Sequence, residues 1–224
     1  MVLDIQAFTK LRPYLFHATA RSNLACIRDE RALLSPSLLS GDTATQRDKP
    51  LMVWRGPFRI TLRDQLPLQR GHVQLCGGWT RSDLIEALNA RVFFWPGNAD
   101  EPIAHGTRLM SAYATQDEAV LRIPFRTLLA ANPAKPPEFC AYNSGAPRTT
   151  AGRKSPRGPA IFTTAARWAF PLSRVVEVAF VRGVALPPDT MIKTGSNWVP
   201  LWNSNRGSRL TTACSGRASR AAEA

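Results

Sequence analysis

The chain contains no apolar run near the roughly 18–20 residues that a membrane-spanning helix needs. Its N-terminal segment carries an acid and lacks the continuous apolar stretch of a signal peptide. We therefore expect a cytoplasmic protein with no membrane segment. Apolar residues make up 44% of the 224 residues, which is enough for the core of a globular domain.

Cysteine and histidine are scarce and are not spaced as metal ligands. The four cysteines stand at positions 26, 76, 140 and 214 and never as C-x-x-C. The three histidines, at 17, 72 and 105, form no H-x-x-x-H pair. We expect reduced thiols and no metal site.

Four common catalytic and nucleotide-binding motifs are absent. The chain has no P-loop, no G-x-G-x-x-G after a strand, and no G-x-S-x-G elbow. It also lacks the H-x-E and C-x-x-C combination of zinc deaminases. Its chemistry therefore has to come from a different arrangement of residues.

Basic residues outnumber acidic ones by 29 to 16, which gives a formal net charge of +13. Such a charge favours anionic partners such as nucleic acid or phosphorylated ligands, although a basic solubilising surface is the alternative interpretation. The segment Pro147–Arg174 holds six basic residues and no acid. This local block favours an anionic partner more than the total does.

The order of elements predicts an α+β domain, because strands and helices alternate irregularly and without glycine-rich turns. Thr80 and Asp83 form the pattern of a capping box at a helix start. We expect one domain over residues 1–202, a long loop over 144–159, and a flexible basic tail over 203–224. The expected strands are 58–62, 92–95, 119–124, 139–143 and 175–181, and the expected helices begin near 22, 80, 107 and 125.

An apolar strand near the N-terminus carries a histidine and runs into a capped helix. In the stretch Pro13–Ile27, alternation places His17 on one face with Leu15 and Thr19. An imidazole and a hydroxyl there could hold a nucleotide-sized ligand. The alternative is a histidine that is hydrogen-bonded within the core.

A carboxylate stands among apolar residues in the late strand Val175–Val181. An unpaired charge is costly in such a place, so Glu177 is a candidate functional group. A glutamate on the surface, or one paired with an arginine, is the alternative. Asn23, Arg91 and the pair Asn143–Ser144 could likewise bind a ligand or serve as cap, strand end and turn.

Short motifs resemble the opening of ADP-ribosyltransferase folds, and DarT-type DNA-targeting toxins in particular. They are Phe16-His17-Ala18-Thr19 followed by Ser22-Asn23-Leu24-x-x-Ile27. The strand Val92–Pro96 resembles the second strand of that fold, and the Glu177 strand resembles the one with the catalytic glutamate. The pattern is also similar to an uncharacterised bacterial family that shares FHAT, LRDQ-x-PL and VFFWPG.

The resemblance implies a split mixed β-sheet with flanking helices and NAD as co-substrate. It implies that ADP-ribose passes to an anionic macromolecule, with DNA or RNA as first expectation, and that an antitoxin protein could be a partner. Glu177 and His17 would be catalytic. The cofactor-binding residues would be His17, Thr19, Asn23, Arg91, Phe94 and Tyr113, and the substrate-binding ones Asn143, Ser144, Arg148, Arg153 and Arg157.

The chain also departs from that family. An arginine expected just after the second strand is replaced by Pro96-Gly97-Asn98-Ala99, with Arg91 as the substitute at hand. Three other interpretations therefore stay open. They are a transferase fold that binds NAD without turnover, a non-catalytic nucleic-acid-binding or toxin–antitoxin module, and a phosphate-handling RNA-processing enzyme.

Overall fold

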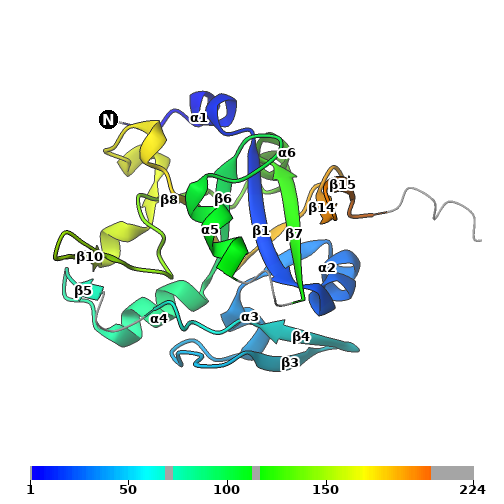
Figure 1. Ribbon diagram of the computed structural model, residues 1–224, viewed down its shortest axis with the longest axis horizontal. Coiled ribbons are helices and arrows are strands. Elements are labelled where there is room, and N and C mark those ends of the chain that lie inside the picture. Colours follow the sequence, from blue (N-terminus) through cyan, green and yellow to red (C-terminus); the bar gives the residue numbers. More distant parts are fainter. Residues whose placement is uncertain (1, 69–72, 113–116, 203–224) are drawn as a thin grey trace, which may run out of the picture.

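An eight-stranded antiparallel sheet forms the centre of the structure (Figure 1), a computed structural model that describes residues 2–68, 73–112 and 117–202. Its strand order is β11-β8-β12-β6-β1-β7-β14-β15. The strands are β1 (Tyr14–Ala20), β6 (Arg91–Gly97), β7 (Glu118–Pro124), β8 (Glu138–Cys140), β11 (Thr163–Thr164), β12 (Glu177–Val181), β14 (Met191–Thr194) and β15 (Asn197–Pro200). The predicted α+β class is confirmed. The predicted tail, 203–224, lies outside the described residues.

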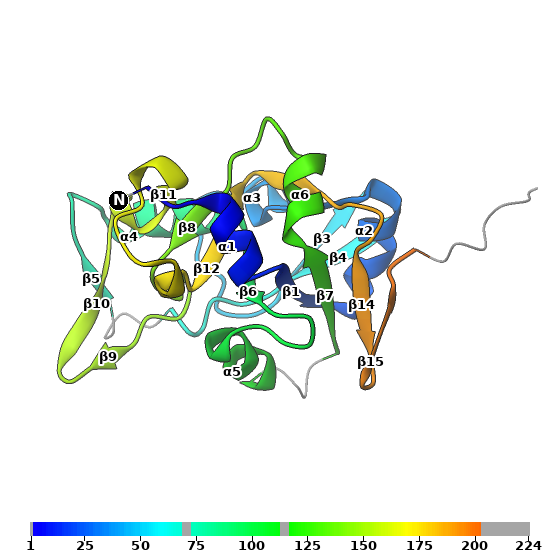
Figure 2. The ribbon, with the colours of Figure 1, turned by 90° about the horizontal axis from the view of Figure 1, so that it is seen from above.

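Three small sheets flank the main one. They pair β2 (Ala32–Leu34) with β13 (Gly183–Ala185), β3 (Leu51–Arg55) with β4 (Phe58–Leu62), and β10 (Arg153–Arg157) with both β5 (Val73–Leu75) and β9 (Thr149–Thr150). The β5–β10 pair is parallel, whereas the pairs of the main sheet are antiparallel. In Figure 2 the β5–β10–β9 sheet and the β14–β15 hairpin lie at opposite ends of the molecule.

The prediction of a long loop over 144–159 is wrong for its second half. That segment forms the β9–β10 hairpin, in which Arg153 is opposite Thr150. Its other neighbour, β5, lies about eighty positions earlier in the chain, with Val73 opposite Ser155. Such pairing leaves no local pattern in a stretch rich in glycine, proline and arginine.

The helices are short, and the side chains of Asp4 and Thr80 each cap one of them. The cap predicted for the helix near Ser22 is wrong, because that helix has no side-chain cap hydrogen bond at Asn23. The capping box is confirmed, since the Thr80 hydroxyl accepts from the Asp83 amide and Asp83 accepts from the Thr80 amide. The helices are α1 (Ile5–Leu11), α2 (Leu24–Glu30), α3 (Pro36–Ser40), α4 (Arg81–Asn89), α5 (Ala104–Ala112) and α6 (Phe125–Ala131). Within the described ranges, no helix is both long and apolar enough to cross a membrane.

One face of the main sheet carries the larger hydrophobic core. Leu15, Leu121, Phe94 and Phe180 alternate inward from four adjacent strands and are fully buried. The rings of Phe94 and Phe180 meet edge to face, with centroids 5.8 Å apart. This packing fixes the middle of the sheet, where the two central strands then separate.

The central strands β1 and β6 pair over only part of their length. β1 pairs with β7 along all of its residues but with β6 only over Tyr14–Phe16. Beyond that point β6 pairs with β12 instead, from Phe94 to Arg91. The sheet is therefore split between β1 and β6, and the split opens next to His17.

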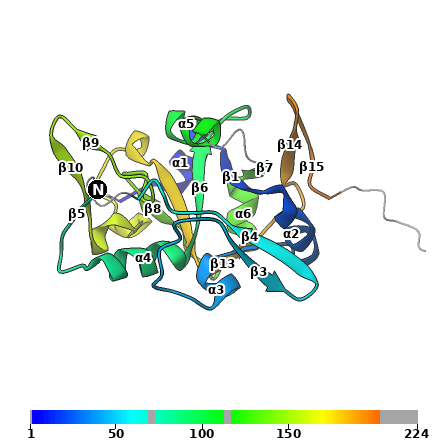
Figure 3. The ribbon, with the colours of Figure 1, turned by 60° about the horizontal axis from the view of Figure 1, so that its bottom comes forward.

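The β3–β4 hairpin covers the open end of the split. Figure 3 shows it running across the lower part of the molecule beside α2 and α3. Its inner side chains, among them Ile60 and Leu62, pack with Cys26 in a separate small core. A wall for a cavity thus stands opposite β1.

Candidate functional site

Two adjoining cavities occupy the split. The larger, of about 460 Å³, is lined by His17 and Thr19 and is called here the His17 cavity. The smaller, of about 180 Å³, is lined by Ser144 and Glu177 and is called the Glu177 cavity. The larger volume is within the roughly 300–1,000 Å³ of small-molecule sites. Both cavities share a border that includes Arg47, Arg63, Asp64, Arg91, Phe93 and Trp95.

His17 bridges the two separated strands. Its Nδ1 lies 2.9 Å from the carbonyl oxygen of Phe93, at the level where β1 and β6 no longer pair. A carbonyl only accepts, so Nδ1 carries the proton. The pKa of His17 is lowered to about 4, chiefly by burial and to a smaller extent by the charge of Arg63, while the hydrogen bond to Phe93 acts against this shift. At neutral pH the imidazole is therefore uncharged, and Nε2 is a hydrogen-bond acceptor in the cavity wall.

Glu177 is a buried carboxylate with one oxygen fixed in place. Its Oε2 accepts from the Ser144 amide at 2.9 Å and from the Ser144 hydroxyl at 2.6 Å. The residue is 3% exposed, and burial raises its pKa to about 7. The Ser144 hydrogen bonds and the charge of Arg157 act against that rise. Among the described residues, no hydrogen bond to Oε1 is present, so this oxygen can serve a ligand.

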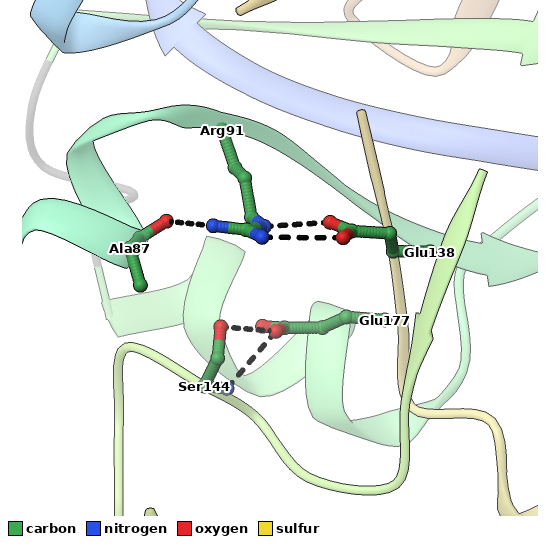
Figure 4. A network of polar contacts seen from close by, with 5 residues as sticks. All are labelled: Ala87, Arg91, Glu138, Ser144 and Glu177. Atoms are coloured by element: carbon green, nitrogen blue, oxygen red, sulfur yellow. Dashed lines mark hydrogen bonds and ion pairs between the residues drawn. The ribbon is translucent and has the colours of Figure 1, made fainter. Parts of the chain in front are cut away.

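Arg91 lies between the two cavities but already has partners. Its Nε and Nη2 form a two-point ion pair with Glu138, at 2.6 and 3.2 Å, and Nη1 donates to the Ala87 carbonyl (Figure 4). Its guanidinium also stacks 4.0 Å from the ring centre of Phe162. The structure thus places Arg91 at the predicted site, where its charge is compensated within the fold.

Asn23 and Thr19 join the hairpin to the sheet. The Asn23 amide donates to the Thr19 hydroxyl at 3.0 Å and to the Thr61 carbonyl at 2.9 Å, and it accepts from the Thr61 amide at 2.8 Å. Asn23 therefore acts as a clip between β1 and β4. Both residues line the His17 cavity, and the clip fixes its width.

Other predicted site residues lie elsewhere. Phe94 lines neither cavity and is fully buried in the core, and its neighbours Phe93 and Trp95 line both. Arg148 and Arg153 are exposed around the β9–β10 hairpin. Arg157 is 1% exposed and lies behind the loop that holds Asn143 and Ser144. Tyr113 lies outside the described residues.

Two basic lining residues, Arg47 and Arg63, were not predicted from the sequence. They stand in polar segments with no periodic pattern, so nothing local indicated their position. Arg63 forms an ion pair with Glu118, and thereby joins the hairpin to β7. Strand alternation indicates which aromatic residues of β6 line the site, because Trp95 shares a face with Phe93 and not with Phe94.

The arrangement suits a polar ligand that spans both cavities. It offers a neutral acceptor at His17, a carboxylate poised near neutrality at Glu177, and arginines at the shared border. The described ranges contain no group of three or more histidine, cysteine or acidic side chains that could hold a metal ion.

Comparison with known proteins identifies the family of the chain, and the function of that family is unknown. The chain belongs to the family of unknown function DUF7002, whose model matches residues 13–187. That range contains His17, Glu177 and every residue named above that lines a cavity. No curated protein and no solved structure matches the chain.

Proposed function

We propose that this DUF7002 protein is an NAD-dependent ADP-ribosyltransferase that passes ADP-ribose to an anionic macromolecule and releases nicotinamide. The observation that carries the proposal is the meeting of His17 and Glu177 at adjoining cavities of one split sheet, although 160 positions separate them. The short motifs around both residues resemble that enzyme class. The split between β1 and β6 agrees with the fold that the resemblance implies.

In this proposal the bond between the ribose C1′ and nicotinamide breaks, and nicotinamide leaves with the bonding electrons. Glu177 in its ionised form accepts a hydrogen bond from a ribose hydroxyl and stabilises the positive charge that develops at C1′. The acceptor forms the new bond to C1′, and its proton passes to Glu177 or to water. His17 accepts a hydrogen bond through Nε2 and fixes the pose of the ligand.

Two residues that line the cavities, Thr19 and Arg47, have donors that can bind the ligand. Thr19 retains a hydroxyl proton that it can donate, because its oxygen is the acceptor in the hydrogen bond from Asn23. Arg47 lines both cavities, and its side chain donates to described residues through Nε and Nη1. Its remaining Nη2 donors suit a phosphate oxygen of NAD.

An anionic acceptor agrees with the charge near the Glu177 cavity. The β9–β10 hairpin directly follows the loop Asn143–Ala146 that lines this cavity. Arg148, Arg153 and Lys154 are exposed there. Phosphates of DNA or RNA are the natural partners of such a cluster. The proposal also includes an antitoxin protein as a partner.

The test is the release of nicotinamide from NAD by native protein, with and without nucleic acid. We expect Glu177→Gln to lower the rate by about 10²-fold or more, because it removes the negative charge from the reacting centre. Glu101→Gln, an exposed neutral control, should keep the native rate. A protein that only binds nucleic acid would release no nicotinamide and would bind equally well after Glu177→Gln.

A further inference from the structure

Arg157 on β10 is a buried cation without an ion-pair partner among the described residues. It is 1% exposed, and no carboxylate oxygen of the described chain lies within ion-pair distance of it. A buried guanidinium is costly unless its donors are used. All three of its nitrogens are used, and every acceptor is a backbone carbonyl.

The carbonyls that Arg157 binds belong mainly to the loop beside Glu177. Nη2 donates to the Asn143 carbonyl at 2.6 Å and Nε to the Ser144 carbonyl at 3.2 Å. Nη1 donates to the Pro156 carbonyl at 2.9 Å, and the guanidinium lies 5.4 Å from the ring centre of Tyr142. A planar fork that spans two consecutive carbonyls fixes the orientation of the peptide between them.

That peptide is the one whose amide serves the carboxylate. The N–H between the Asn143 carbonyl and Ser144 points at Glu177 Oε2, and the Ser144 hydroxyl binds the same oxygen. Arg157 thus donates hydrogen bonds to the backbone on one side of Ser144, and Glu177 accepts hydrogen bonds from Ser144 on the other. Arg157 lines neither cavity, so it has no direct route to a ligand.

Arg157 is also the cation that acts on the ionisation of Glu177 from within the fold. Cys140 on β8 is directly opposite Glu177 in the sheet register. The Arg91 guanidinium faces this region but is paired with Glu138. The remaining charged groups around the Glu177 cavity are Arg47, Arg63 and Asp64.

We propose that Arg157 is a positioning residue: it aims both Ser144 donors at Glu177, and its charge favours the ionised carboxylate. The effect of Arg157 on catalysis rests on the proposed function, whereas its effect on Glu177 itself does not. It gives Arg157 a role different from direct substrate binding.

The test compares Arg157→Met, which removes the charge, and Arg157→Lys, which keeps a charge but not the planar fork. Arg167→Met is the control, because Arg167 is an exposed arginine that lines neither cavity. The first readout is the pH dependence of the difference in melting temperature between each protein and its Glu177→Gln counterpart. This difference isolates the titration of Glu177 and needs no NAD.

In the native background the difference should change as the pH rises from about 4.5 and level off near pH 7, and the pH at which it levels off follows the pKa of Glu177. With Arg157→Met this levelling pH should rise by about half a unit or more, because a favourable charge and two aligned donors are disturbed. Arg157→Lys should produce a smaller rise, and Arg167→Met none. An unchanged levelling pH in folded Arg157→Met and Arg157→Lys proteins would overturn the inference. If Arg157→Met does not fold, Arg157→Lys alone decides by the same criterion.

The second readout is the kinetics of nicotinamide release. Arg157→Lys should lower kcat by about tenfold or more and change KM by less than about twofold, because the loss occurs in the transition state. A higher KM with unchanged kcat would show contact with the ligand and overturn the inference. A native protein without nicotinamide release would refute the proposed function, while the titration of Glu177 would still decide the role of Arg157.

Discussion

At the residue scale the site depends on two buried ionisable groups, Glu177 and His17, whose pKa values are shifted in opposite directions. Burial raises the pKa of Glu177 to about 7 and lowers that of His17 to about 4. The carboxyl group is therefore close to its point of half ionisation at pH 7, and the imidazole is neutral. Their roles differ accordingly, with charge supplied by Glu177 and a fixed acceptor by His17.

Glu177→Gln should change how stability depends on pH. The usual pKa of 4.5 is raised in the folded protein, so folding favours the protonated form. This contribution is complete at low pH and is lost as pH rises through about 7. The free energy of unfolding of the variant should therefore gain on the native protein above pH 5, by at most about 1.4 kcal/mol per pH unit. Chemical denaturation at pH 5 and pH 8, with Glu101→Gln as control, measures this gain, and parallel profiles would contradict it.

His17 should stay neutral across the physiological range. Because burial depresses its pKa to about 4, we expect no protonation between pH 5.5 and pH 8. Imidazole ¹⁵N chemical shifts should show a protonated Nδ1 and an unprotonated Nε2 throughout, as the bond to the Phe93 carbonyl requires. A titration with a midpoint near 6.5 would mean that His17 is solvated and does not bridge the strands.

At the scale of elements, the cavity exists because β1 leaves β6 after Phe16 and the β3–β4 hairpin covers the gap. The two parts are joined by a few polar contacts. Asn23 supplies three of them, and the Arg63–Glu118 ion pair adds another directly after β4. The width of the cavity is thus set by side chains that span two elements.

Asn23→Ala should loosen the hairpin without unfolding the sheet. The change leaves the Thr61 amide and carbonyl without their partners, which costs about 1–3 kcal/mol. Amide hydrogen exchange should accelerate in β4 and stay slow in β6. Ser22→Ala is a matched control, because the Ser22 hydroxyl makes only long contacts of 3.3 and 3.5 Å. Equal protection of β4 in the native and Asn23→Ala proteins would contradict the claim that Asn23 holds β4 against β1.

The elements that the sequence predicted best are those with a strong local pattern. Alternation identified β1, β4 and β12, an apolar run bounded by proline and glycine identified β6, and capping chemistry identified α4. The β9–β10 hairpin and its parallel partner β5 were missed because the β5–β10 pairing is distant in the sequence and the composition of both segments is that of a loop. Within the site, His17 and Glu177 were found as unusual residues in apolar strands. The position of Arg157 could not be predicted, because it depends on the folded conformation of the loop whose carbonyls it binds.

At the scale of the whole molecule, the two halves of the split sheet each carry one of the key groups. His17 lies on the half that contains β1 and β7, whereas Glu177 lies on the half that contains β6, β8 and β12. A ligand that occupies both cavities binds the folded state across this division and should stabilise it. The basic β9–β10 hairpin lies at one end of the molecule, beside the Glu177 side, where an anionic acceptor could approach (Figure 1).

The most direct measurement of the central claim is a calorimetric titration of NAD into folded Glu177→Gln protein, which separates binding from turnover. The account predicts one site per chain with a Kd below about 1 mM, corresponding to at least about 4 kcal/mol of binding free energy. It also predicts at least about tenfold weaker binding after His17→Ala, because the Nε2 acceptor is lost. No detectable NAD binding by the folded native and Glu177→Gln proteins would contradict the claim that the two cavities form one NAD site.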